Sequence, residues 1–416
     1  MSVARTILLI GTLDTKGAEY AYVRDRIRSH GDEALVMDLG ILGEPAFPPD
    51  VPAADVARAG GGDLSALRAR GDRGSAVEIM LAGACALVPA LHAKRRFDAV
   101  LGLGGGGGTA MIAAAMRTLP VGVPKLMVST MASGNTAPYV DVKDITMMYS
   151  VADIAGLNPL TRRILTNAAG AICGMAAADA GPATEPGRPL VAATMFGVTT
   201  PCVTAVRERL ERAGYDVLVF HATGTGGRAM EGLIADGYVA GVADVTTTEW
   251  CDEVVGGVLS AGPDRLGAAA RAGVPQVVSV GALDMVNFGA FDDVPERFRG
   301  RKLYRHNPAV TLMRTTPDEC TEIGTRIAAQ LNRATGPVVL MLPLRGVSAI
   351  DKAGEPFHDP DADAALFAAL RARAAPHVRI VDVDVHINDP AFAEAVSAQL
   401  CELLNETGTA PVTAES

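Results

Sequence analysis

The 416-residue chain is too long for one ordinary hydrophobic core, so two domains of about 200 residues each are expected. Its formal net charge of −10 argues against a general nucleic-acid or membrane-surface binder, although an acidic protein can still bind anions locally. Six cysteines without a C-x-x-C pair, and a first apolar stretch too short for a signal peptide, indicate a cytoplasmic protein without a zinc site or disulfide framework.

The first predicted strand, Thr6–Ile10, leads into the loop GTLDTKG at residues 11–17, and a helix continues through Glu19 to Ser29. Open α/β sheets bind ligands at loops that follow the carboxyl ends of strands. The lysine of this loop could meet a phosphate, its threonines could donate hydroxyls, and its aspartate could hold a metal ion or a ribose. The alternative is a helix cap, in which the aspartate or the second threonine satisfies free N–H groups. The candidate cofactor-binding residues here are Gly11, Thr12, Asp14, Thr15 and Lys16.

A long excursion follows the second predicted strand, Ala34–Leu39. Residues 43–74 are rich in proline and glycine and are expected to carry one short helix, in a segment of the length that lids and subunit contacts often have. A long helix is predicted at residues 75–94. Because Glu78 and Pro89 interrupt its apolar window, we expect no membrane span and no membrane partner.

A short apolar strand at residues 98–103 runs into five consecutive glycines, and an alanine-rich helix follows. Glycines let the backbone approach an anion closely, and the first N–H groups of a helix have no internal partner and favour negative charge. The spacing satisfies G-x-G-x-x-G, whereas Gly108 stands where a P-loop would have its lysine. We therefore predict a phosphate cradle of dinucleotide or mononucleotide type, formed by Gly104, Gly105, Gly106, Gly107, Gly108 and Thr109. The alternative is a tight turn that only packs the helix on the strand, a task that a single glycine performs.

The next predicted strand, residues 125–129, also ends in a small, hydroxyl-rich loop, whose candidate residues are Thr130, Ser133, Gly134 and Asn135. Three strands of one domain thus end in loops rich in glycine, serine and threonine, which indicates a nucleotide crevice. A further strand at 146–150 precedes a helix from Pro159, a favoured first-turn residue. The small residues of that helix allow close contact, either at a subunit interface or against the domain's own sheet.

A proline- and glycine-rich linker at residues 182–189 separates an N-terminal domain, 1–181, from a C-terminal domain, 190–416. Six further strands alternate with helices and are predicted at residues 190–195, 217–221, 239–245, 276–280, 338–342 and 378–383. This alternation predicts an α/β fold of two Rossmann-like, doubly wound domains with mainly parallel sheets. Residues 23–36 align without a gap on residues 206–219, which suggests that the two domains are related.

The C-terminal domain has polar loops of its own. The segment HATGTGGRAME at 221–231 is a second glycine and threonine turn, and its arginine near a helix start is favourable only if an anion binds between them. Acids crowd the end of the strand near residue 245, where they could bind magnesium, act as acid or base, or be solvated residues of a helix start. Catalytic candidates are His221, Glu231, His306 and Arg345, substrate-binding candidates are Thr223, Gly226, Arg228 and Ser348, and metal candidates are Glu249 and Asp252. Among them, His306 lies in a predicted polar loop and is the best-placed histidine for acid–base chemistry.

Five motifs in order carry a resemblance along nearly the whole chain: GTLDTKGAE, GLGGGGGTA, STMASGN, HATGTGGRAME and LPLRGVSAID. The sequence resembles an uncharacterised bacterial family that is related to the ATP-binding N-terminal region of the plant tobamovirus-resistance protein. The resemblance implies two Rossmann-like domains, ATP binding chiefly by the N-terminal domain, and a homodimer. In the plant relative, the region blocks viral RNA replication by binding a viral protein. We do not expect that role here, because the sequence ends at Ser416, where the plant protein continues into a further domain.

Two functions of different classes are expected from these features. The first is an ATP-binding enzyme, with or without Mg²⁺, whose small anionic substrate lies between the domains near His221, Arg228, His306 and Arg345. The second is a nucleotide-responsive binding protein, in which ATP stabilises a dimer or a partner-competent shape without turnover. A dinucleotide-dependent oxidoreductase is a weaker third, because no predicted strand clearly ends in an acid that would bind a ribose, although Asp141 or Asp144 could be considered.

Overall fold

The computed structural model describes residues 4–178 and 187–409. The chain divides into two compact units, Met1–Thr184 (unit 1) and Glu185–Ser416 (unit 2), so the division falls inside the segment that was predicted to be a linker. Residues 182–186 of that segment lie outside the described residues. Both units are α/β structures built on a largely parallel sheet, and the predicted fold of two Rossmann-like domains is confirmed.

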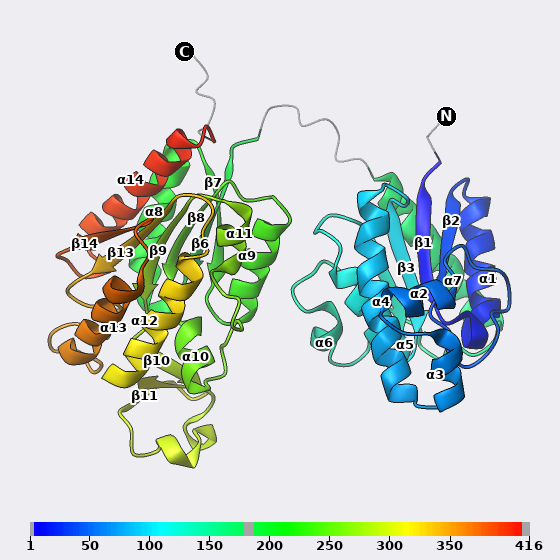
Figure 1. The fold of residues 1–416 in the computed structure, drawn as a ribbon, viewed down its shortest axis with the longest axis horizontal. Coiled ribbons are helices and arrows are strands. Elements are labelled where there is room, and N and C mark those ends of the chain that lie inside the picture. Colours follow the sequence, from blue (N-terminus) through cyan, green and yellow to red (C-terminus); the bar gives the residue numbers. More distant parts are fainter. Residues whose placement is uncertain (1–3, 179–186, 410–416) are drawn as a thin grey trace. The chain divides into compact units, whose positions relative to one another are not determined.

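Unit 1 contains a five-stranded parallel sheet with the order β2-β1-β3-β4-β5 (Figure 1). Its strands are β1 (Thr6–Gly11), β2 (Glu33–Asp38), β3 (Ala99–Gly104), β4 (Lys125–Ser129) and β5 (Thr146–Tyr149). Its helices are α1 (Leu13–Ser29), α2 (Ala53–Ala59), α3 (Leu64–Arg70), α4 (Arg73–Ala93), α5 (Gly106–Arg117), α6 (Ala137–Val140) and α7 (Pro159–Ala177). Alternate side chains of the buried strands pack on α1 and α7 on one face and on α2, α4 and α5 on the other.

The strand order of unit 1 places a switch point between β1 and β3. The chain leaves β1 to form β2 on one side and returns to form β3 on the other, so the two following loops diverge. Ligands of open α/β sheets bind in the crevice at the carboxyl ends of such strands, and the 2-1-3-4-5 order places that crevice between the first and third strands. The loops after Gly11 and Gly104 therefore meet at the most probable ligand position of the sheet.

The excursion of unit 1 differs from its prediction, whereas the long helix after it agrees. Residues 43–74 carry two short helices, α2 and α3, instead of one. Helix α4, 21 residues long, confirms the long helix predicted at 75–94 and runs through Glu78 and Pro89; by length and composition alone it could cross a membrane. That test is weak for a single helix, because the core helices of globular proteins also pass it. Met80 and Val88 of α4 are buried against α2 and α5.

Unit 2 contains a six-stranded parallel sheet with the order β7-β6-β8-β9-β13-β14 (Figure 1). These strands are β6 (Leu190–Met195), β7 (Asp216–His221), β8 (Gly241–Thr246), β9 (Gln276–Gly281), β13 (Val338–Pro343) and β14 (Val378–Val383). Helices α8 (Thr200–Arg212) and α14 (Pro390–Glu406) cover one face. The other face is covered by α9 (Thr225–Ala235), α10 (Glu249–Val255), α11 (Gly267–Ala272), α12 (Pro317–Leu331) and α13 (Pro360–Arg373).

A second, three-stranded antiparallel sheet of unit 2 was not predicted. It has the order β10-β12-β11, with β10 at Met285–Phe288, β11 at Leu303–Asn307 and β12 at Val310–Arg314. His306 therefore lies in an edge strand and not in the loop that its polar neighbours suggested. The polar run LYRHN is a strand because β12 supplies its hydrogen-bonding partner.

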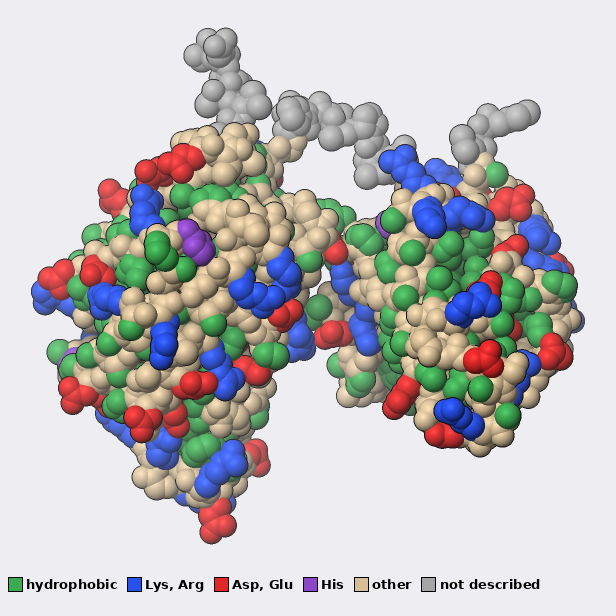
Figure 2. Space-filling model, in the orientation of Figure 1, with side chains coloured by type: hydrophobic (Ala, Val, Ile, Leu, Met, Phe, Trp, Pro, Cys, Tyr) green, Lys and Arg blue, Asp and Glu red, His purple; other side chains and the backbone are tan. Residues whose placement is uncertain are grey.

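The two units follow the same strand order through their first five strands, which agrees with the aligned segments in the sequence. Val23 of α1 and Val206 of α8 occupy aligned positions, and both are buried where the first helix covers its sheet. The helices lead into β2 and β7, which pair with the first strand of their own sheet. On the face shown in Figure 2, each unit carries acidic and basic side chains interspersed, without a continuous basic field.

Candidate functional site

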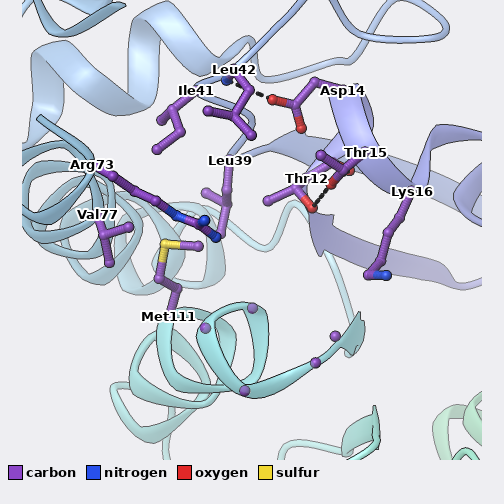
Figure 3. A pocket seen from close by; sticks show the side chains of 15 residues that line it. Thr12, Asp14, Thr15, Lys16, Leu39, Ile41, Leu42, Arg73, Val77 and Met111 are labelled. Carbon is purple, nitrogen blue, oxygen red and sulfur yellow. Dashed lines mark hydrogen bonds between the residues drawn. The ribbon is translucent and has the colours of Figure 1, made fainter. Parts of the chain in front are cut away.

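A cavity of about 280 Å³ lies at the switch point of unit 1. The loop after β1 and the glycine turn after β3 form two of its walls, and the sides of α4 and α5 and the segment after β2 complete it (Figure 3). Its lining includes nine of the predicted residues: Thr12, Asp14, Thr15, Lys16, Gly104, Gly105, Gly106, Gly107 and Gly108. The structure thus brings two separate sequence motifs together around one space.

The glycine turn is shorter than predicted, because helix α5 begins inside it. Gly104 is the last residue of β3, Gly105 is the N-cap, and α5 starts at Gly106. The first intrahelical bond runs from the Thr109 amide to the Gly105 carbonyl, at 2.8 Å. The amides of residues 106–108 therefore have no intrahelical acceptor, and Gly105 has no side chain that could cap them. These N–H groups and the helix dipole favour an anion at this end.

Packing explains only the first of the five glycines. A Cβ on Gly104 would lie 2.8 Å from the Thr109 backbone nitrogen, which is too close for any side chain. At Gly105, Gly106 and Gly108 the nearest atom to an added Cβ lies 3.8–3.9 Å away, and at Gly107 nothing lies within 4 Å. None of the five has a positive φ. Neither packing nor backbone conformation requires glycine at 105–108, although glycine lowers helix stability there.

The threonines and Asp14 line the side of the cavity formed by the start of α1 (Figure 3). The hydroxyls of Thr12 and Thr15 are 2.7 Å apart and hydrogen-bonded to each other. Asp14 accepts hydrogen bonds at Oδ2 from the amides of Leu42 and Gly43, at 2.7 and 3.2 Å. Its buried Oδ1 has no hydrogen-bond partner among the described residues. Asp14 thus joins two loops and keeps one oxygen available, and it does not cap its own helix.

Two cations lie at the cavity, and the sequence pointed to one of them. The Lys16 ammonium donates to the backbone carbonyl of Ile154, so it is held at the rim between α1 and the loop before α7. Arg73, the first residue of α4, extends toward the cavity from the side opposite Thr12 and Thr15 (Figure 3). No local sequence pattern predicts that Arg73 lies at this cavity, because its position depends on how α4 packs beside β2 and α5.

An apolar wall of the cavity was also missed. It consists of side chains from the segment after β2 and from α4 and α5, namely Leu39, Ile41, Leu42, Val77 and Met111. Leu42 is a large apolar side chain left 66% exposed. A cavity with free amides on one side and apolar side chains on the other suits a ligand with a charged end and a flat or apolar end.

Gly11 has a structural reason to be glycine. A Cβ there would lie 1.9 Å from the hydroxyl oxygen of Tyr20, so Gly11 makes room for that ring and does not line the cavity. The Tyr20 hydroxyl donates to the Ile10 carbonyl and accepts from the Leu103 amide at 2.7 Å. Complete burial raises the pKa of Tyr20. This buried side chain, which the sequence did not single out, ties the end of β1 to the end of β3 directly beneath the switch point.

The remaining predicted cofactor residues lie outside the cavity lining. Thr109 is buried, and its hydroxyl bonds to the Ser129 hydroxyl at 2.7 Å, so it joins the start of α5 to the end of β4. The loop after β4 flanks the glycine turn on the side away from β1, and the Thr130 hydroxyl lies 3.8 Å from where a Cβ of Gly105 would be. None of the four predicted residues of that loop belongs to the cavity lining: Thr130, Ser133, Gly134 and Asn135.

An acidic residue that could bind a ribose was also overlooked. Asp38 is the last residue of β2, but its Oδ1 accepts from the amides of Leu13 and Gly40, at 2.9 and 2.8 Å. Burial raises the pKa of Asp38, and these two amides oppose the shift. Because the carboxylate is buried and caps the start of α1, it is not presented to a ribose.

In unit 2 the catalytic candidates do not form one site. His221 ends β7 at one edge of the sheet, whereas Arg345 follows β13, four strand positions away. Strands lie about 4.8 Å apart, so roughly 19 Å separates the two strand ends. Arg345 is two-thirds exposed and paired with Asp384 at 2.8 Å, and His306 lies in the other sheet. The expectation that these three residues share a site is wrong.

The acids near β8 form a buried ion network and not a metal site. The Arg265 guanidinium contacts Asp244 at 2.5 Å, Glu249 at 2.6 Å and Glu231 at 3.1 Å. Backbone amides satisfy further oxygens of both glutamates: Glu249 accepts from the amides of residues 224 and 227, and Glu231 from those of residues 266 and 268. Burial raises the pKa of Glu231, and the positive charge of Arg265 opposes this shift. The network fixes the loops around α9 and α11, which explains why these acids follow a strand end.

Asp252, the other metal candidate, is bound to Asn287. Its two oxygens accept from the Asn287 amide at 3.0 Å and side chain at 2.7 Å, and burial raises the pKa of Asp252 to about 7. Within residues 4–178 and 187–409, no group of three or more His, Cys, Asp or Glu side chains could hold a metal ion by itself. The predicted magnesium site of Glu249 and Asp252 is therefore wrong.

The substrate-binding candidates are likewise separated or engaged. A Cβ on Gly226 would lie 1.8 Å from the His221 carbonyl oxygen, so packing requires that glycine. The Thr223 hydroxyl donates to the same carbonyl, at 3.3 Å, and Arg228 donates to the Ser260 carbonyl. Ser348 is buried and donates to Asp284 at 2.8 Å. The turn at 221–231 is thus an internally bonded helix start.

Comparison with known proteins accounts for nearly the whole chain. A family model described as the Uncharacterised protein family (UPF0261) N-terminal domain matches residues 5–181, and the model of the C-terminal domain of the same family matches residues 188–404. The chain belongs to the UPF0261 family. Both matched segments coincide with the two compact units, and the N-terminal match contains the complete lining of the cavity at β1 and β3.

Relatives of this UPF0261 protein occur in bacteria and in a plant. A UPF0261 protein of Clostridium tetani is 51% identical over 97% of this chain and 100% of its own length. The ToMV susceptible protein tm-1(GCR26) of Solanum lycopersicum is 38% identical over 97% of this chain and 56% of that protein. The ToMV resistance protein Tm-1(GCR237) is 43% identical over 80% of this chain and 45% of that protein. The predicted relationship to the plant resistance protein is thereby confirmed, and this chain corresponds to about half of each tomato protein.

Proposed function

We propose that this protein binds ATP at the carboxyl ends of β1 and β3, with the phosphates on the amides of residues 106–108. One observation carries the proposal: four consecutive glycines line the cavity where neither packing nor a positive φ requires them. An absent side chain at the start of a helix lets an anion reach the free N–H groups, because the Cα–Cβ bonds of a helix tilt toward its N-terminus.

The other cavity residues fit the parts of a nucleotide. Arg73 and Lys16 stand on two sides of the glycine turn and would neutralise phosphate charge, and Lys16 would exchange its carbonyl partner for a phosphate oxygen. Magnesium requires oxygen ligands and usually shares them with the phosphates. Asp14 Oδ1 and the Thr12 hydroxyl are the protein oxygens that would contribute. The apolar wall around Met111 would contact the base.

Two outcomes of binding are proposed as alternatives. In the first, the protein is an enzyme that uses ATP on a small anionic metabolite. In the second, ATP stabilises a homodimer or a partner-competent shape without turnover. Under both alternatives we propose that the protein is cytoplasmic. A dinucleotide as the ligand is less favoured, because Asp38, the acid that ends β2, is buried and engaged by backbone amides.

Thermal unfolding with added nucleotides tests the proposal. ATP with Mg²⁺ should raise the unfolding temperature of unit 1, whereas NAD at the same concentration should not, because a ligand stabilises only the state that binds it. Phosphate or AMP released in the presence of a co-substrate would support the enzyme, and unchanged ATP with protection retained would support the binding protein. Equal protection by NAD, or none by ATP, would refute the assignment.

A further inference from the structure

A second cavity, of about 520 Å³, lies in unit 2 at the carboxyl end of β13 and the start of α13. Its polar lining includes Arg345, Lys352 and His358, and its apolar lining includes Leu344 and Phe367. It is not the switch point of this sheet, which lies between β6 and β8. There the buried hydroxyls of Thr199 and Thr246 are hydrogen-bonded to each other at 2.8 Å. The cavity at β13 therefore needs its own explanation.

The loop that forms this cavity is held by an unusual buried charge cluster. Arg314 donates to Asp363 at 2.7 Å and to the Phe357 carbonyl at 2.7 Å, and lies 3.6 Å from Asp351. Asp284, Asp351 and Asp363 are all buried around this one guanidinium. Oδ1 of Asp284 and Oδ1 of Asp351 accept no hydrogen bond from any residue in the described part of the chain. A buried cluster of this kind can be purely structural, as around Arg265, and it indicates a binding site only where one of its members lines a cavity.

Asp363 is the residue of this cluster that lines the cavity. Burial and the neighbouring Asp351 raise the pKa of Asp363, and Arg314 opposes the shift. The raised pKa weakens the repulsion that this carboxyl would exert on an anion, because its charged form is less favoured. The other polar side chains of the lining, Arg345, Lys352 and His358, can all donate hydrogen bonds, and Arg345 is also paired with Asp384 at 2.8 Å.

We propose that this cavity binds an organic anion, whose carboxylate or phosphate group lies among Lys352, His358 and Arg345 and whose apolar part contacts Leu344 and Phe367. The proposal does not rest on ATP binding, because every residue that carries it belongs to unit 2. If the protein is an ATP-using enzyme, this cavity would bind its small anionic metabolite. If it is not, the cavity would bind a regulatory anion. The two anion types share the same donors, so the experiment must distinguish them.

Protection of lysines from acylation, measured by mass spectrometry on the full chain, reads this site separately from the nucleotide site. Unit 2 contains two lysines, Lys302 and Lys352, and both are exposed, so Lys302 is an internal reference. Lys16 reports on the cavity of unit 1 in the same sample. The probes are benzoate, phenyl phosphate and the neutral benzyl alcohol. At saturation, at least one anion should slow acylation of Lys352 about tenfold, the equivalent of one hydrogen bond to a charged group, and leave Lys302 unchanged.

Two tryptophan variants on one helix provide the matched control. Ala364 is exposed and lines the cavity, whereas Ala368, one turn later on α13, is exposed and does not. Ala364→Trp should fill the space and abolish the protection of Lys352, and Ala368→Trp should retain it. The proposal is overturned if neither anion protects Lys352, if benzyl alcohol protects it equally, or if protection survives in Ala364→Trp. Protection of Lys16 by ATP alone, with Lys352 never protected, would refute this site and leave the nucleotide proposal standing.

Discussion

Replacing Gly107 by alanine should stabilise the protein and weaken its binding of ATP. Nothing lies within 4 Å of an added Cβ at this position, and the residue occupies the first turn of α5 with no positive φ. Alanine therefore fits without strain, and it is favoured over glycine in a helix by about 0.5–1 kcal/mol. Its methyl group would tilt toward the helix N-terminus, where the phosphate has to approach.

The size of the expected loss follows from the contact that is blocked. A hydrogen bond to a charged group contributes about 1.5–3 kcal/mol, so losing one amide–phosphate bond should weaken ATP binding at least about tenfold. At a concentration of 100 times the wild-type Kd, ATP should stabilise the wild type by about 2.7 kcal/mol. A variant with tenfold weaker affinity should gain about 1.4 kcal/mol under the same conditions.

Denaturant unfolding of the full chain, with and without ATP, measures both effects in one experiment. Gly174→Ala is the matched control, because Gly174 lies in helix α7 of the same unit, is exposed, and has nothing within 4 Å of its Cβ position. It should raise the stability of unit 1 similarly and leave the gain from ATP unchanged. If ATP stabilises Gly107→Ala as much as it stabilises Gly174→Ala, the free amides of α5 do not hold the phosphate.

Three further changes test how the structure is held. Tyr20→Phe should lower the unfolding free energy of unit 1 by about 1–3 kcal/mol in urea, because it leaves the buried Leu103 amide without its partner; an unchanged midpoint would contradict this role. Arg265→Ala should lower the unfolding free energy of unit 2 by about 3–5 kcal/mol, since the carboxylates of Asp244, Glu249 and Glu231 lose the cation that they share, and full stability would show that the backbone amides suffice. Because the native pKa of Asp252 is about 7, above its usual range, the unfolded state loses this proton first as the pH rises. Stability should therefore fall between about pH 4 and pH 7, and Asp252→Asn should flatten that dependence in urea midpoints measured across the range.

The parallel strands could be predicted because their signal is local. Buried strands such as β3 and β13 are short apolar runs bounded by glycine or proline, and the helices between them follow the expected alternation. The antiparallel strands carry no such signal. Strand β11 reads as a polar loop because it lies at a sheet edge, and β10 is only four residues long. Their pairing depends on β12, which no local pattern identifies.

In the candidate site, too, the residues with a local sequence signal could be predicted and those placed by packing could not. The two loops that end β1 and β3 could be found from their composition, but their meeting depends on the strand order. Arg73 and Met111 reach the cavity from helix faces whose direction is set by packing, so no local pattern distinguishes them from other helix residues. Conversely, Glu249 was a candidate because acids crowd the end of β8, and Glu231 because it belongs to the glycine and threonine turn at 221–231. The structure shows why they are there, since both bind a buried arginine from a distant segment.

The two units share one topology but carry different residues at its switch point. Both sheets have the order that opens a crevice between the first and third strands. In unit 1 the residues at that point are glycines without side chains, and a cavity remains. In unit 2 the segment after β6 carries Thr199 and β8 ends in Thr246; these two side chains bond to each other, and the ion network of Arg265 holds the adjacent loops. The two hydroxyls of unit 2 thus satisfy each other at the point where unit 1 has helix amides without an intrahelical acceptor. If the glycines of unit 1 served packing alone, they would resemble Gly226, whose Cβ position is already occupied by the backbone; the open space at 105–108 is what supports the proposed phosphate site.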